Sequence, residues 1–200
     1  MLEDFRQVPG EHLDPDGYSA DFVRFVGDIK SSFTKLECAQ HYSESGNPSW
    51  EAFAAGRWDE ALRLMNADHG DLLHQLVADG RIDYRRVRVV TLPLTPYIQW
   101  ELNAFQRRNA VLGEQIRVVV DGGSNQLTTL PELVVIDDTV AFEVLYDDAG
   151  VHSGARLVAE PETVAAARRG IMALFERGIP LVDFYSSEVA DLPAPRGQQA

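Results

Sequence analysis

The pattern of apolar and polar positions is clearest between Tyr84 and Val120, and the rest of the chain is interpreted around this stretch. The β-branched run Val87–Val90 predicts one strand, and Ile116–Val120 predicts another. Between them, Thr95-Pro96 is typical of a helix start, and apolar residues then recur at helical spacing before Gly113. A crossover of this length suits two parallel strands of one sheet with the helix lying on it.

The pattern before this unit predicts an extension and then a mainly helical region. Residues 1–18 contain turn signals without a periodic apolar face, which indicates a surface arm. Residues 21–29 place their apolar side chains on one side of an amphipathic helix, so we expect residues 1–31 to form an N-terminal extension with one helix. Further elements are predicted as a strand at 33–42, a helix at 50–65 interrupted near Gly56, and a helix at 68–78.

The pattern after this unit predicts more strands and a final helix. The apolar runs 133–136 and 140–146 indicate adjacent strands joined by a tight Asp137-Asp138 turn, and residues 155–158 indicate one more strand. The segment that begins with Pro161 has the apolar spacing of a helix and ends at Gly178.

These elements predict an α/β fold with a single mixed sheet. The strand-helix-strand unit is central, and helices from the N-terminal half and one C-terminal helix cover the sheet. Residues 32–188 are expected to form one α/β domain, and residues 189–200 a loose tail without apolar residues to bury.

Composition narrows the classes of partner. The chain has 200 residues, 45% of them hydrophobic, and a formal net charge of -13, which argues against direct binding of nucleic acid or anionic lipid because those ligands need cationic side chains. No stretch approaches the roughly 18 apolar residues of a membrane span. With Cys38 as the single cysteine, no internal disulfide is possible, and a cytoplasmic protein is expected.

Metal and nucleophile motifs are not recognisable in the sequence. Cys38 and His41 would point to opposite faces of a strand, and no histidine or acid spacing matches a known zinc or calcium motif. Ser124 and Ser153 do not lie in the G-x-S-x-G context of a serine nucleophile. We therefore predict neither a metal site nor a cofactor.

The strongest candidate site lies on the predicted central helix. Tyr97, Glu101 and Arg108 fall on one stripe beside its apolar face, with Trp100 next to them. A buried glutamate needs either a ligand or a partner such as Arg88 or Arg86, and the structural pair is the favoured alternative. Because ligands of open α/β sheets bind where parallel strands end, we expect a pocket bordered by Arg88, Tyr97, Trp100, Glu101 and Asp137.

Several segments together resemble an uncharacterised actinobacterial domain family that is often encoded beside helix-turn-helix regulators. They are F-T-K-L-E (33–37), R-R-V-R-V-V (85–90), Y-I-Q-W-E-L (97–102), G-E-Q-I-R-V (113–118) and Y-D-D-A-G (146–150). The resemblance covers about residues 32–185 and implies an α/β domain with a sensing or partner-binding role. A looser likeness is to one half of a phospholipase-D-like sheet, but the His-x-Lys pair of those enzymes is absent here.

Two functional hypotheses follow. The first is a non-catalytic module that binds a small molecule or a helix-turn-helix regulatory protein and is linked to transcriptional regulation. The alternative is a small enzyme of specialised metabolism with Glu101 or Asp137 as general base and Arg88 holding an anionic substrate. The alternative requires a buried carboxylate, so a solvent-exposed Glu101 would exclude it. No oligomeric state is indicated by the sequence.

Overall fold

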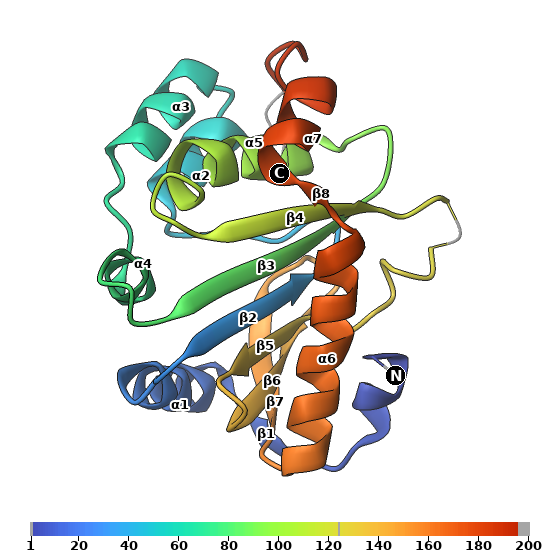
Figure 1. Ribbon diagram of the computed structural model, residues 1–200. Coiled ribbons are helices and arrows are strands. Elements are labelled where there is room, and N and C mark those ends of the chain that lie inside the picture. The colour runs from blue at the N-terminus through green and yellow to red at the C-terminus, as the bar shows by residue number, and fades with distance from the viewer. Residues whose placement is uncertain (1, 124, 196–200) are drawn as a thin grey trace.

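One mixed β-sheet runs through the molecule (Figure 1). The computed structural model describes residues 2–123 and 125–195, and in these ranges the sheet has eight strands in the order β1-β7-β6-β5-β2-β3-β4-β8. β2, β3 and β4 are parallel, and the other neighbouring pairs are antiparallel. The strands are β1 (Glu11–Leu13), β2 (Ser32–Glu37), β3 (Asp83–Val90), β4 (Gln115–Val120), β5 (Leu133–Ile136), β6 (Val140–Tyr146), β7 (His152–Val158) and β8 (Ile179–Pro180). The predicted single mixed sheet is confirmed.

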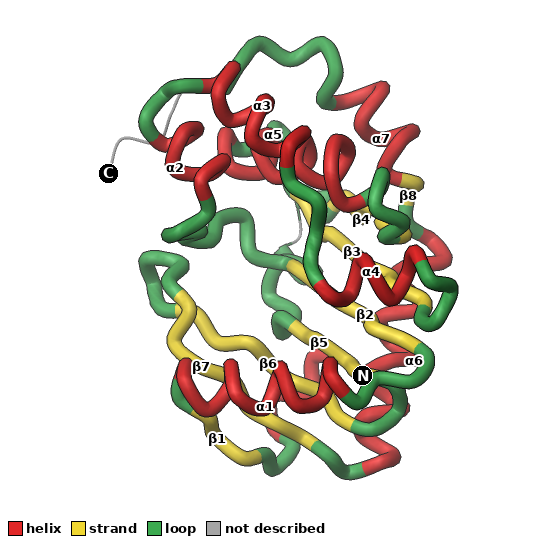
Figure 2. The backbone as a smooth tube through the Cα atoms, turned by 90° about the vertical axis from the view of Figure 1, so that its left-hand side faces the viewer, coloured by secondary structure: helices red, strands yellow, loops and turns green. Residues whose placement is uncertain are grey.

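Helices cover both faces of the sheet (Figures 1 and 2). The long helix α6 and the short 3-10 helix η1 pack on one face, and α1 to α5 pack on the other. α7 follows β8 and packs against β4 and η2. The helices are η1 (Leu2–Gln7), α1 (Pro15–Gly27), α2 (Pro48–Ala54), α3 (Trp58–Ala67), α4 (Leu72–Ala78), α5 (Pro96–Ala104), the π-helical η2 (Phe105–Asn109), α6 (Pro161–Arg177) and α7 (Leu181–Glu188).

The predicted strand-helix-strand unit is confirmed as β3, α5 and β4. Thr95 is the N-cap of α5, and its hydroxyl accepts a hydrogen bond from the Ile98 amide at 3.1 Å, which satisfies one of the free amides of the first turn. The helix then widens into η2, where the Ala110 amide bonds to the Phe105 carbonyl at 2.8 Å, a π-type spacing. β3 and β4 are parallel neighbours, with Arg88 opposite Val118.

The two faces of the central strands carry different kinds of side chain. On β3, Val87 and Val89 point into the apolar core under α6, which also contains Ile171 of that helix. The alternate residues Arg86 and Arg88 are also buried, and they point to the other face, under α5. The period of two along a strand therefore separates an apolar face from a charged one.

The N-terminal segment packs against the sheet more extensively than the sequence indicated. Residues 1–18 were expected to be a surface arm, but Leu2 and Phe5 of η1 are buried and β1 extends the sheet by pairing with β7. At Gly154 of β7, with φ of +127°, a Cβ would lie 2.2 Å from the Leu13 carbonyl oxygen, so only glycine permits this close approach. Asp14 and Pro15 start α1 well before residue 21.

Other boundaries also differ from the prediction. The first central strand ends at Glu37 instead of Tyr42, and the interruption near Gly56 separates α2 from α3 completely. In the expected tail, Val189 is buried, and the Pro193 carbonyl accepts a hydrogen bond from Gln99 at 2.7 Å; residues 196–200 lie outside the described residues. No helix in the described ranges is long and apolar enough to cross a bilayer.

Candidate functional site

Two adjoining cavities lie on the sheet face opposite α6, and we call them together the central cleft. The smaller has a volume of about 390 Å³ and lies among α3, α5, η2 and the loop before α2. The larger has a volume of about 620 Å³ and extends to α1 and α4. Figure 2 shows α6 on the right, and α2 and α3 above α1. Both cavities are lined by Lys35, Glu44, Arg86, Arg108 and Asn109.

The floor of the cleft is a set of ion pairs on β2 and β3. Lys35 Nζ lies 2.6 Å from Glu37 Oε1, and Arg86 Nη1 donates to Glu37 Oε2 at 2.7 Å. Arg86 also pairs with Glu114 through two nitrogens and donates to the Tyr84 hydroxyl at 2.7 Å. Burial alone would raise the pKa of Glu37, but Arg86 and Lys35 outweigh it and hold this pKa well below its usual range. The floor therefore keeps fixed charges that already have partners.

Arg88 lies behind this floor and is occupied by protein groups. Its Nε donates to Glu101 Oε2 at 2.5 Å, its Nη2 to the Ala39 carbonyl at 2.6 Å and its Nη1 to the Val89 carbonyl at 3.0 Å. The side chain is 0% exposed. The favoured structural pairing of Glu101 is thus confirmed, and of the two expected partners, Arg88 and Arg86, it is Arg88 that binds Glu101.

Glu101 and Tyr97 connect this pair to the cleft. The Tyr97 hydroxyl lies 3.0 Å from Glu44 Oε1 and 3.2 Å from Glu101 Oε1, so it can donate to one of the two carboxylates at a time. Burial raises the pKa of Glu101 to about 7, although the Arg88 guanidinium opposes this shift. Glu101 is 4% exposed and lines the smaller cavity. A protonatable carboxyl group therefore borders the cleft.

The wall formed by α4 and η2 contains two more ion pairs. His74 Nδ1 lies 2.8 Å from Asp71 Oδ1, and Arg108 Nε lies 2.8 Å from Asp68 Oδ2. Burial disfavours the charged imidazole, but the hydrogen bond with Asp71 and the nearby Glu114 carboxylate, 3.8 Å from Nε2, outweigh it and raise the pKa of His74 to about 9. His74 is therefore a cation at neutral pH, and its charge is balanced by these carboxylates.

The wall of the larger cavity on the side of α1 is aromatic. Tyr18 and Phe22 are four residues apart on one side of α1, and their ring centroids lie 5.6 Å apart. The His152 ring lies 5.0 Å from the Tyr18 ring and 6.0 Å from the Tyr146 ring. The cleft thus combines a charged floor with an aromatic wall, a combination that suits a ligand with both polar and apolar parts.

The structure brings four of the five predicted site residues together. Trp100 and Glu101 line the smaller cavity, and the buried Arg88 and Tyr97 lie behind them. Asp137 is not near them. It accepts hydrogen bonds from the Lys30, Ser31 and Ser32 amides at the start of β2, whereas Arg88 is opposite Glu37 at the end of β2.

The separation of Asp137 has a simple cause. β5 is antiparallel to β2, so the end of β5 lies beside the start of β2, and the rule for parallel strand ends does not apply to it. The bonds from backbone amides hold the pKa of Asp137 below its usual range despite partial burial. The expectation that Asp137 borders the same pocket is therefore wrong.

Sequence reasoning missed most of the polar lining. The alternating residues Lys35 and Glu37 on β2 and Arg86 on β3 were a signal, because charges at alternate positions of central strands must be buried together on one face. Glu44 follows the carboxyl end of β2, where sites of α/β sheets are found, but its loop has no recognisable pattern. Phe22 of α1 fitted the apolar side of the predicted helix, whereas Tyr18 fell in the expected surface arm.

Chemistry by other groups has less support in the structure. No three histidine, cysteine, aspartate or glutamate side chains are grouped for a metal ion within residues 2–123 and 125–195. Cys38 is buried in the core under α6, and burial raises the pKa of its thiol well above the usual range. The thiol is therefore protonated and packs as a small apolar side chain.

Solved structures show a weak likeness in fold. Nuc from Salmonella typhimurium, a phospholipase D family member, has 10% identity and a TM-score of 0.45 over 83% of this chain and 92% of Nuc. NucT from Helicobacter pylori has 10% identity and a TM-score of 0.43 over 88% of this chain and 92% of NucT. TrmBL2, an archaeal chromatin protein, has 11% identity and a TM-score of 0.43 over 84% of this chain, which spans about half (54%) of TrmBL2.

The sequence comparisons are more specific. No curated protein matches the chain. A family model described as a domain of unknown function, DUF6879, matches residues 20–186, which include most of α1, all the central strands and every side chain named above for the central cleft except Tyr18. The chain therefore belongs to the DUF6879 family.

Proposed function

We propose that this protein is a non-catalytic module that binds a small molecule in the central cleft. The observation that carries the proposal is the pair of adjoining cavities over β2 and β3, together large enough for a metabolite. Ion pairs already fix the charged floor, so a ligand would meet groups that need little reordering.

A thermal-shift screen against metabolites, with a blocked variant, tests this proposal. Ala67, the exposed last residue of α3, lines the smaller cavity, and Ala67→Trp should fill it. Ala78, the exposed last residue of α4, lines neither cavity, so Ala78→Trp is the matched control. Val23, exposed on α1, lines the larger cavity, so Val23→Trp should narrow that one. A ligand should raise the Tm of the wild type and of Ala78→Trp but not that of the variant that blocks its cavity, Ala67→Trp or Val23→Trp. A ligand that stabilises all four proteins equally would contradict the proposal.

The second candidate is an enzyme with Glu101 as general base. It is favoured by one observation, the buried carboxyl group whose pKa is raised to about 7, a value suited to proton transfer at neutral pH. Arg88 is a poor choice to hold an anionic substrate, because all three of its guanidinium nitrogens are bonded to protein. Turnover of a ligand from the screen, abolished in Glu101→Gln with binding retained, would support the enzyme.

We also propose that ligand binding is passed to a helix-turn-helix regulator in the cytoplasm. The support is the resemblance to an actinobacterial family encoded beside such regulators. The test is co-purification of the tagged protein with the product of a neighbouring regulator gene, with and without the stabilising ligand. If the ligand does not change the amount of complex, the protein binds the regulator, but the proposal that it passes on ligand binding is contradicted.

A further inference from the structure

The cations of the central cleft are already neutralised by carboxylates. Lys35 and Arg86 contact Glu37, and Arg86 contacts Glu114 as well. On the wall, Arg108 pairs with Asp68, and His74 pairs with Asp71. A phosphate or carboxylate ligand would have to compete with these internal partners, and the formal net charge of -13 would also repel it.

Glu44 differs from the other carboxylates of the cleft. Within the described ranges it has no cation within 4.0 Å, and its hydrogen-bond partner is the Tyr97 hydroxyl at 3.0 Å. It is half-buried, and it is the one described acid that lines both cavities. Its backbone is held in place because the Asn47 amide donates to the Glu44 carbonyl at 2.9 Å. A fixed carboxylate without a counter-ion thus lies where the cavities meet.

The aromatic wall of the larger cavity provides a second element. The rings of Tyr18, Phe22 and Tyr146 line the same cavity as Glu44, and no described arginine or lysine lies over them. The cleft arginine Arg86, in contrast, already lies over the Phe105 ring at 4.6 Å. Ring faces attract organic cations, and aromatic side chains around a carboxylate are a common way to bind amines and quaternary ammonium groups.

We infer that the ligand of the central cleft is an organic cation, an amine or quaternary ammonium group on an apolar body. Glu44 binds the charged group where the cavities meet, and the rings of Tyr18, Phe22 and Tyr146 contact the apolar body. This inference rests on the proposed ligand-binding function and adds the chemical class of the ligand. It also predicts that anions of the same size are excluded.

The test uses three probes of matched size that differ in charge: phenethylamine, 2-phenylethanol and 3-phenylpropionate. Isothermal titration at neutral pH should show phenethylamine binding about tenfold more tightly than the alcohol, and the carboxylate more weakly than both. Glu44→Gln keeps an acceptor for Tyr97 but removes the charge, so it should lower phenethylamine affinity about tenfold and leave the alcohol unchanged.

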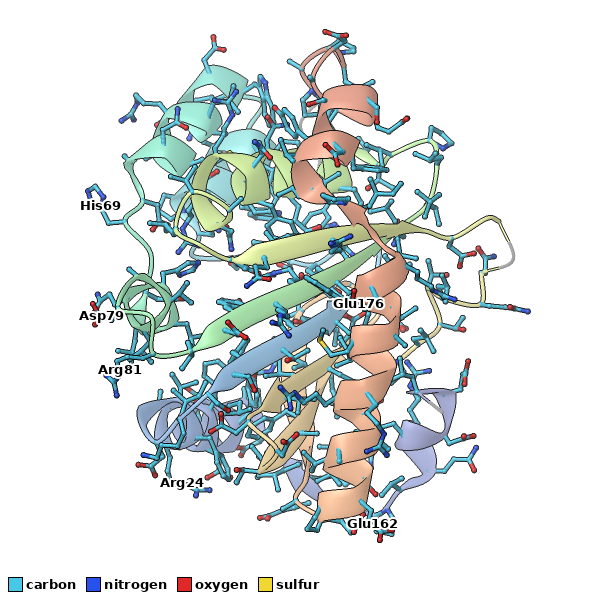
Figure 3. All side chains as sticks on the ribbon, viewed as in Figure 1. Arg24, His69, Asp79, Arg81, Glu162 and Glu176 are labelled. Carbon is cyan, nitrogen blue, oxygen red and sulfur yellow. The ribbon has the colours of Figure 1, made fainter. Side chains whose placement is uncertain are left out.

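The charge-matched control is Glu176→Gln, on the helix α6 that covers the opposite face (Figure 3). It changes the net charge equally and should leave phenethylamine affinity unchanged. The inference is overturned if the carboxylate binds as tightly as the amine, if Glu44→Gln binds the amine like the wild type, or if no probe binds. The proposed ligand-binding function is tested separately. It would still hold if a metabolite of another class stabilised the wild type but not Ala67→Trp.

Discussion

The two faces of the central strands differ in what holds them together. Under α6, Val87, Val89 and Ile171 belong to an apolar core, whose contacts are numerous and do not depend on direction. On the other face, Arg86 and Arg88 are equally buried, and each depends on carboxylates in defined positions. Charge pairs also occur on the α6 side, where Glu143 contacts Arg6 and Arg156 near η1.

This difference suggests separate roles for the faces. An apolar face tolerates repacking, and it contributes stability in proportion to the area it buries. A buried ion pair contributes little net stability compared with a well-packed apolar pair, but it fixes the position of polar groups. The face that carries the cleft is therefore the one where geometry is specified most strictly.

The largest effect is expected from breaking the buried pair under α5. Arg88→Met leaves Glu101 without its cation, and the free energy of unfolding should fall by about 3–5 kcal/mol at pH 8. The loss should be smaller at pH 6, because the pKa of Glu101 is already about 7 with Arg88 present and rises further without it. Urea unfolding at both pH values measures this.

The double variant Arg88→Met, Glu101→Leu is the control for this experiment. It replaces both charges with apolar groups, so most of the lost stability should return, to within about 1 kcal/mol of the wild type. If the double variant is as unstable as Arg88→Met, the comparison between the faces fails, because packing and not charge would then explain the loss.

A smaller loss of unfolding free energy is expected from a substitution on the apolar face. Ile171→Ala creates a cavity under α6 and should lower the free energy of unfolding by about 2–4 kcal/mol, with little dependence on pH between 6 and 8. Arg169→Ala, on the exposed side of the same helix, should change it by less than about 0.5 kcal/mol. A strong pH dependence of the Ile171→Ala loss would contradict the apolar description of this face.

A further effect, which depends on pH, concerns His74 on the wall of the cleft. Its folded-state pKa of about 9 lies above the ordinary value of 6.5, so the charged imidazole stabilises the fold fully below about pH 6.5. This contribution should be lost as pH rises through about 9, by at most about 1.4 kcal/mol per pH unit.

The measurement for His74 is a comparison of urea unfolding from pH 6 to pH 10. The difference in unfolding free energy between the wild type and His74→Gln should shrink over this range. Nuclear magnetic resonance of the imidazole should show titration near pH 9. An imidazole that titrates near 6.5 would show that Asp71 and Glu114 do not hold the charge.

Local patterns predicted the centre of the fold well. The β-branched residues of β3 and β4 and the Thr95-Pro96 start of α5 act over a few residues, so their interpretation did not depend on the rest of the chain. A partner for Glu101 was expected in Arg88 or Arg86, and the structure shows Arg88, which lies on the strand directly before that helix.

Long-range pairing explains what could not be predicted. The direction of β5 relative to β2, and with it the position of Asp137, depends on two segments separated by about a hundred residues. The pairing of β1 with β7 also needs partners from opposite ends of the chain. The larger cavity of the cleft also brings together distant segments, α1 and η2. Nothing in the local sequence around Tyr18 or Arg108 therefore indicated that both line one cavity.

The wide turn η2 has a consequence for other chains with this architecture. The carbonyls of its first and last residues, Phe105 and Asn109, accept hydrogen bonds from the amides five residues later, Ala110 and Glu114, so the turn holds one residue more than an α-helical turn would. Deleting a single amino acid there would rotate the following side chains by about 100° and carry Asn109 away from Glu114. A change of one residue in the length of this turn would thus alter the lining of the central cleft and leave the sheet in place.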